Sequence, residues 1–215
     1  MRNMDAYIFD LDGTLLDTLD DLAASANHAL AVFGMPTHST DDIRRFVGNG
    51  VRKLMERAVP DGERNPLFEE VLNTFRKYYM EHERDTTQPY PGIIPLLRHL
   101  KTLNKSVAVV SNKFDAATKS LCAHYFGPLV DVAIGESEHI QRKPAPDTVV
   151  EALRQLGIPA QKAVYIGDSD VDIATAANCG MPCISVLWGF RDREFLLAHG
   201  ATTLVEKPED ILTIS

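Results

Sequence analysis

The stretch that decides the fold is Ala6-Tyr-Ile-Phe9, followed at once by Asp10-Leu11-Asp12-Gly13-Thr14. An apolar run of this length without polar alternation indicates a strand that is buried on both faces, as in a parallel sheet. In open α/β sheets, ligands bind beyond the carboxyl ends of the strands, which is where the two aspartates stand. The stretch therefore predicts a parallel sheet with a polar site at one edge.

Similar apolar runs recur along the chain and alternate with amphipathic segments. The predicted strands cover residues 6–9, 106–110, 130–134, 163–166 and 183–187, and the predicted helices between them cover 93–103, 116–126, 148–156 and 172–178. Strands that alternate with helices predict an α/β fold with a doubly wound, Rossmann-like parallel sheet.

The interval from residue 16 to residue 87 interrupts this alternation. It holds no convincing strand, and its apolar residues recur at helical spacing, as from Leu22 to Phe33 and from Leu67 to Tyr79. The turn-rich segment Gln88-Pro-Tyr-Pro-Gly92 follows it. The interval is too long for a simple crossover, so we expect an α/β core of residues 1–15 and 88–215 and an inserted helical cap of residues 16–87.

Composition excludes several classes of protein. The chain has 215 residues, 45% of them hydrophobic, and a net charge of −8, which argues against disorder and against sequence-independent binding of nucleic acid. No apolar stretch is long enough for a membrane span, and the start of the chain does not resemble a signal peptide. Three cysteines are too few for a disulfide scaffold. We expect a cytoplasmic protein without a nucleic-acid or membrane partner; the oligomeric state is not predicted.

Carboxylates from distant parts of the chain are expected at one edge of the sheet. Asp10 and Asp12 follow the first predicted strand, and Asp168 and Asp172 follow the fourth. Two carboxylates about 4 Å apart repel by roughly 4 kcal/mol at an effective dielectric near 20. Their convergence therefore requires a cation or retained protons, and an all-oxygen ligand set favours Mg²⁺.

Two further segments add groups that suit a phosphoryl ligand. Ser111-Asn112-Lys113 follows the second predicted strand, and Arg142-Lys143-Pro144 precedes the helix before the fourth. A lysine and a divalent cation offset negative charge, while hydroxyl and amide groups donate hydrogen bonds. The combination predicts a site for a small phosphorylated substrate.

These motifs resemble those of the haloacid dehalogenase superfamily of hydrolases. Asp10-x-Asp12-Gly-Thr14 is similar to the first motif, Ser111 to the second, Lys143 to the third, and Asp168 with Asp172 to the fourth. The helical insertion matches the C1 cap of that superfamily. The segments 46–50, 111–113, 142–146 and 167–169 look most like phosphoglycolate phosphatases.

The resemblance implies a role for each residue. Asp10 would attack phosphorus and form an aspartyl-phosphate, and Asp12 would act as general acid and then as general base. The residues that would hold Mg²⁺ are Asp10, Asp12, Asp168 and Asp172. Asp12 would contribute its backbone carbonyl, and Asp172 would act directly or through a water. Lys143 would complete the catalytic set by offsetting charge. The implied substrate-binding residues in the core are Ser111, Asn112 and Thr14, the last by orienting its loop.

Other interpretations stay open at this point. The Asp-Gly pair can shape a turn, Ser111 can cap a helix, Lys143 can be a solvated cation, and Asp172 can favour a helix N-terminus. The alternative functions are a phosphomutase of the same superfamily similar to beta-phosphoglucomutase, a pyrophosphatase or nucleotidase, and a binding protein without catalysis.

The predicted cap carries a basic cluster around the turn Gly48-Asn-Gly50. Its members are Arg44, Arg45, Arg52, Lys53 and Arg57. We expect the turn to face the core, with one of Arg45, Arg52 or Lys53 contacting an anionic substrate tail such as a carboxylate; the alternative is a solvated helix face. Hinges near residues 15–18 and 85–92 would let the cap close over the site and exclude water.

Overall fold

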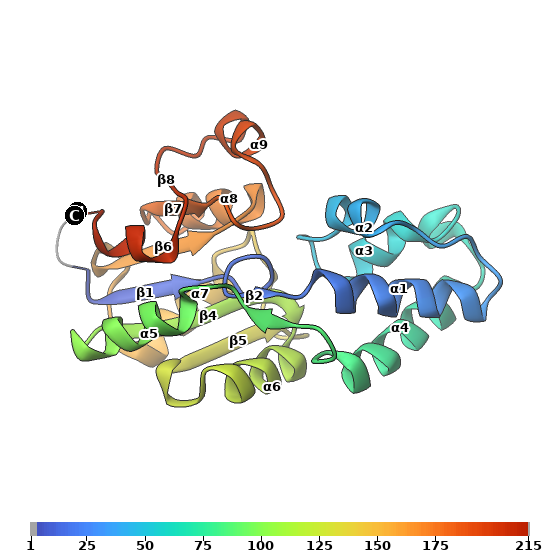
Figure 1. The fold of residues 1–215 in the computed structure, drawn as a ribbon, viewed down its shortest axis with the longest axis horizontal. Helices are drawn as coiled ribbons and strands as arrows, with labels where there is room; N and C mark the ends of the chain where they lie inside the picture. The colour runs from blue at the N-terminus through green and yellow to red at the C-terminus, as the bar shows by residue number, and fades with distance from the viewer. Residues whose placement is uncertain (1–3, 215) are drawn as a thin grey trace.

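The computed structural model describes residues 4–214 and contains one large parallel sheet. Its order is β5-β4-β1-β6-β7-β8, and every pair of neighbours is parallel. The strands are β1 (Ala6–Phe9), β4 (Ser106–Phe114), β5 (Val132–Glu136), β6 (Ala163–Gly167), β7 (Cys183–Val186) and β8 (Leu204–Val205). The first strand in the chain thus lies inside the sheet, between β4 and β6 (Figure 1).

Both faces of the sheet are covered by helices. The helices of the core are α5 (Ile93–Thr102), α6 (Asp115–Tyr125), α7 (Asp147–Leu156), α8 (Asp170–Asn178) and the short α9 (Arg193–Ala198). Neighbouring residues of β1 pack on opposite faces of the sheet. Phe9 belongs to an apolar cluster with residues of α5 and α6, and Ile8 belongs to another with residues of α7 and α8. Burial on both faces explains the unbroken apolar runs, and it confirms the predicted doubly wound α/β fold.

A helical insertion separates β1 from the rest of the sheet. It contains α1 (Leu19–Val32), α2 (Thr40–Phe46), α3 (Val51–Ala58) and α4 (Phe68–His82), which form a layer of their own beside the core (Figure 1). These helices bury a separate apolar cluster that includes Leu30, Leu54 and Phe75. A short antiparallel pair, β2 (Leu16–Asp17) with β3 (Gln88–Pro89), joins the two ends of the insertion to the core.

The structure differs from the expected elements in five places. Strand β4 continues through Ser111, Asn112 and Lys113, which were expected to follow the strand. Pairing with β5 shifts register after Val110 and resumes at Phe114, so the polar residues lie within an irregular part of the strand. The two-residue strands β2, β3 and β8 and the six-residue helix α9 are too short to give a periodic pattern.

Between residues 4 and 214, no helix has the length and apolar character needed to cross a bilayer.

Candidate active site

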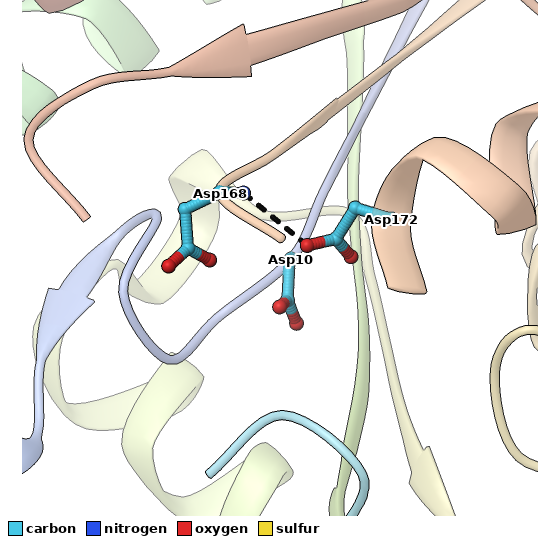
Figure 2. Close-up of side chains that lie close together, drawn as sticks. All are labelled: Asp10, Asp168 and Asp172. Carbon is cyan, nitrogen blue, oxygen red and sulfur yellow. Dashed lines mark hydrogen bonds between the residues drawn. The ribbon is translucent and has the colours of Figure 1, made fainter. Parts of the chain in front are cut away.

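Three buried carboxylates meet at the carboxyl edge of the sheet. Asp10 follows β1, Asp168 follows β6, and Asp172 lies in the first turn of α8; one oxygen of each lies within 4.8 Å of the others (Figure 2). Burial, then the charge of Asp172, raises the pKa of Asp10 well above its usual range, and the same two causes raise the pKa of Asp168 to about 7. Such a cluster is stabilised when a cation lies among the oxygens.

Asp168 is held by two loops from different parts of the core. The Thr14 hydroxyl donates to its Oδ1 at 3.2 Å, and the Phe190 amide donates to its Oδ2 at 2.7 Å. Gly13 has a φ of +83°, and a Cβ at this position would lie 2.4 Å from Oδ2 of Asp168. Only glycine therefore permits both the backbone conformation and the close approach of the carboxylate.

Lys143 lies between two members of the cluster. Its Nζ atom is 2.8 Å from Oδ1 of Asp10, 2.8 Å from Oδ1 of Asp172 and 3.0 Å from the Tyr165 hydroxyl. Burial lowers the pKa of Lys143, but the two carboxylates outweigh that effect and hold the pKa above its ordinary value. The ammonium therefore stays charged and neutralises part of the buried acidic cluster.

Asp172 has a structural role in addition to its place in the cluster. Its Oδ2 accepts from the amides of Asp168 (3.2 Å) and Ser169 (3.1 Å) and from the Ser169 hydroxyl (2.6 Å), which forms a capping box at the start of α8. Its Oδ1 accepts from Lys143 and from the Tyr165 hydroxyl (2.9 Å). Both oxygens are thus engaged by protein donors, so this residue orients Lys143 and begins the helix.

The Asp12 side chain lies outside the carboxylate cluster. Its Oδ1 accepts from the Thr18 hydroxyl at 2.7 Å, and its Oδ2 lies 3.0 Å from Nζ of Lys113. This arrangement does not bring the Asp12 carboxylate to the expected metal site. It leaves the backbone carbonyl as the group through which Asp12 would contact a metal ion, as the resemblance implied.

Ser111 and Asn112 line a small cavity between the insertion and the core. The Ser111 Oγ accepts from the Lys113 amide at 3.1 Å, and among residues 4–214 its own proton has no acceptor. The Asn112 amide nitrogen donates to the carbonyls of Lys143 (3.0 Å) and Gly48 (3.3 Å), and its buried Oδ1 has no partner among the described residues. Both side chains thus retain hydrogen-bonding capacity for a ligand.

The cavity has a volume of about 50 Å³. Asp12 and Asp168 line its core side, and Gly48 and Gly50 of the turn line its other side. Its apolar lining from the insertion consists of Leu22, Val47, Val51 and Leu54. A cavity of this size suits a phosphoryl group on a small organic fragment.

The two arginines predicted at the substrate lie elsewhere. Arg52 pairs with Glu63 and Glu69, at 2.7 Å each, and stacks over the Phe68 ring; Arg45 pairs with Asp42 on the exposed face of α2. Neither lines the cavity. The acidic partners of both guanidinium groups belong to the insertion itself.

Two residues without an expected role are prominent in the site. Lys113 was noted only as part of a motif, yet its side chain reaches Asp12. Arg191 lines the cavity and donates to the carbonyls of Arg44 (2.7 Å) and Val47 (2.8 Å) at the end of α2. Arg191 comes shortly after β7, which is the fifth strand predicted from the sequence. The rule that ligands bind beyond the carboxyl ends of strands could therefore have identified it.

Comparison with known proteins gives the family. Residues 7–186 match the haloacid dehalogenase-like hydrolases, and the chain belongs to that family. It resembles the phosphoglycolate phosphatases within it: that of Aquifex aeolicus is 34% identical over 87% of this chain and 86% of its own length, and that of Caulobacter vibrioides is 35% identical over 86% and 79%. A crystal structure of a candidate phosphoglycolate phosphatase from Lactobacillus delbrueckii subsp. bulgaricus superimposes with a TM-score of 0.92, 38% identity and 97% coverage of both chains. The helical insertion after β1 is accordingly a cap of the C1 kind.

Proposed function

We propose that this enzyme is a Mg²⁺-dependent phosphatase that hydrolyses a small phosphate monoester, with 2-phosphoglycolate as the favoured substrate. The observation that carries the proposal is the position of Lys143, which lies 2.8 Å from Asp10 within a buried acidic cluster. The small cavity under the cap supports a small substrate, and the names of the relatives support the glycolate ester.

The side chains of the site fit a magnesium ion. All donors of the cluster are carboxylate oxygens, which are the ligands that Mg²⁺ prefers. Asp10 and Asp168, together with the backbone carbonyl of Asp12, would hold the ion, and Asp172 would act through Lys143 or a water. When bound, Mg²⁺ supplies positive charge that offsets the phosphoryl oxygens and the nucleophile.

The protein groups divide the reaction into two displacements. In the first, the Asp10 carboxylate bonds to phosphorus, the bond from phosphorus to the leaving oxygen breaks, and Asp12 transfers a proton to that oxygen. In the second, Asp12 takes a proton from water, the water oxygen bonds to phosphorus, and inorganic phosphate leaves with Asp10 regenerated. Lys143 offsets charge on Asp10, and the Ser111 hydroxyl donates to a phosphoryl oxygen.

The proposed domain boundaries lie at the short β2–β3 pair that joins the insertion to the core. We assign residues 1–15 and 88–215 to the core and 16–87 to the cap, of which residues 1–3 and 215 lie outside the described part of the chain. The pairing of β2 with β3 places the two linkers side by side, which supports a hinge there. Three free cysteines support a reducing, cytoplasmic location.

Hydrolysis of a panel of phosphate esters, with and without Mg²⁺, tests the proposal. We expect phosphate release that requires Mg²⁺, is highest with 2-phosphoglycolate, and is lost in Asp10→Asn. Interconversion of sugar phosphates without net phosphate release would instead identify a phosphomutase. Full activity of Asp10→Asn would contradict the proposed nucleophile.

A further inference from the structure

A buried lysine in the site has no part in the reaction described above. Lys113 lies near the end of β4, its side chain is 1% exposed, and its Nζ atom is 3.0 Å from Oδ2 of Asp12. The structure thus places a buried lysine side chain in direct contact with the proposed general acid.

Both oxygens of the Asp12 carboxylate accept hydrogen bonds, and the two donors come from different elements of the fold. Lys113 engages Oδ2 from the central sheet, and the Thr18 hydroxyl engages Oδ1 from the linker that leads into α1. A carboxylate with one partner can rotate about its side-chain bonds, whereas two partners on opposite oxygens define its orientation. Orientation matters here because a general acid must lie within hydrogen-bond reach of the leaving oxygen.

The other side of the Lys113 ammonium contacts the cap. Its Nζ atom lies 4.6 Å from the centroid of the Tyr79 ring, which belongs to α4 and is fully buried. A cation over an aromatic face is attracted to it, and the attraction strengthens where water is excluded. Lys113 therefore lies between the proposed general acid in the core and an aromatic ring in the cap.

We propose that Lys113 is a positioning residue that orients the Asp12 carboxylate for proton transfer, with the Tyr79 ring holding the ammonium in place when the cap covers the site. The inference rests on the proposed function, in which Asp12 protonates the leaving oxygen. Lys113 also lines the cavity, so direct binding of the substrate is the competing role. The two roles differ in their dependence on the leaving group.

The test is to compare kcat/KM of Lys113→Met on two substrates that differ in leaving group. One is an alkyl phosphate that the panel identifies as a substrate, and the other is p-nitrophenyl phosphate, whose leaving group needs little protonation. Because general acid catalysis contributes a factor of about 10²–10⁴, we expect a loss of roughly a hundredfold on the alkyl ester and less than about tenfold on the aryl ester.

Three further variants make the outcome decisive. Lys113→Gln, which removes the charge and shortens the side chain but keeps it polar, replaces Lys113→Met if that variant does not fold, and it carries the same expectation. Lys119→Met is the matched control, since Lys119 is exposed on α6 and within residues 4–214 pairs only with Asp115, and it should match the wild type on both substrates. Asp12→Asn reports on the general acid itself and should show the strongest preference for the aryl ester.

Each result separates the two proposals. Equal losses on both esters in Asp12→Asn would overturn the general-acid role on which this inference rests, whereas the proposed phosphatase function fails only if phosphate release does not require Mg²⁺ and Asp10. If Asp12→Asn shows the leaving-group dependence but the Lys113 variants lose activity equally on both esters, or only through KM, Lys113 binds substrate or supports the fold, and the positioning role is wrong. Wild-type activity of the Lys113 variants would also overturn it.

Discussion

The Lys143 ammonium lies 2.8 Å from the Asp10 carboxylate, and this contact joins two segments that are far apart in the chain. Both side chains are largely buried, so neither charge is screened by water. The pair accounts for how an acidic cluster persists at the edge of the sheet. It also gives the Asp10 carboxylate, the proposed nucleophile, a buried cation partner at one of its oxygens.

Replacing Lys143 by methionine should impair both stability and activity. Removing one partner from a buried ion pair leaves uncompensated charge, so we expect the free energy of unfolding to fall by about 3 kcal/mol. Activity should fall by roughly a hundredfold or more, because an electrostatic contact with the reacting groups is lost. Urea unfolding and steady-state kinetics measure the two effects.

Lys162→Met is the control for Lys143→Met. Lys162 is exposed and lies 3.9 Å from Asp5, so its loss should change stability by no more than about 0.5 kcal/mol. Equal effects of the two variants would show that the buried contact has no special importance.

The pKa of Asp168 predicts a pH dependence of metal binding. Burial, then the charge of Asp172, raises this pKa to about 7 from an ordinary value of 3.8. Between these values the folded metal-free protein binds more protons than the unfolded chain, so this group makes stability fall as pH rises from about 4 to 7. Mg²⁺ binds the ionised form, so the Tm increase caused by Mg²⁺ should grow between pH 5.5 and pH 8.

Thermal unfolding with and without Mg²⁺ at several pH values measures this dependence. Asp168→Asn serves as the reference, because it cannot ionise and should show little response to Mg²⁺ at any pH. A wild-type Tm increase that is the same at pH 5.5 and pH 8 would mean that Asp168 is already ionised in the metal-free protein.

Gly13→Ala should abolish metal-dependent activity. The added Cβ would lie 2.4 Å from Oδ2 of Asp168, and the φ of +83° disfavours any side chain. We expect loss of the Mg²⁺-induced Tm increase together with a strain of roughly 1–3 kcal/mol. Gly34→Ala isolates the strain, since Gly34 has a φ of +66° but no described atom within 4 Å of the added carbon. It should cost stability without affecting Mg²⁺ binding.

Arg191 should keep the cap closed over the site. Its guanidinium donates to the carbonyls of Arg44 and Val47 at the end of α2, and charged hydrogen bonds contribute about 1.5–3 kcal/mol each. Arg191→Met should therefore raise KM by roughly tenfold or more, since 1.4 kcal/mol corresponds to a factor of ten. It should also speed limited proteolysis within residues 83–89.

Arg193→Met is the comparison for Arg191→Met. Arg193 is exposed and pairs with Glu206, away from the cap helices. If both variants have the KM and the proteolysis rate of the wild type, the Arg191 contacts do not control access to the site.

The core of the site was predictable because its residues are adjacent to strong local patterns. Asp10 follows an apolar run that forms β1, and Asp168 follows another that forms β6. In a parallel sheet, adjacent strands end at the same edge, so two such runs suffice to predict that their carboxylates converge.

The contacts of long side chains were not predictable in the same way. Most of the charged residues near Arg52 in the sequence are basic, but the fold of the cap brings the carboxylates of Glu63 and Glu69 to its guanidinium group. The contacts of Arg191 depend on how the cap lies on the core, and the sequence around it shows no periodic signal for this. The polar segment Ser111-Asn112-Lys113 was expected to follow the strand because the apolar run ends at Val110, yet β4 continues through these residues with irregular pairing.

Acid quenching of the enzyme during turnover tests the central claim most directly. Mass spectrometry of peptides from protein mixed with the substrate and Mg²⁺ should find one phosphoryl group, carried by Asp10 and absent from Asp10→Asn. A phosphoryl group on another residue would contradict the account. So would turnover at the wild-type rate by Asp10→Asn.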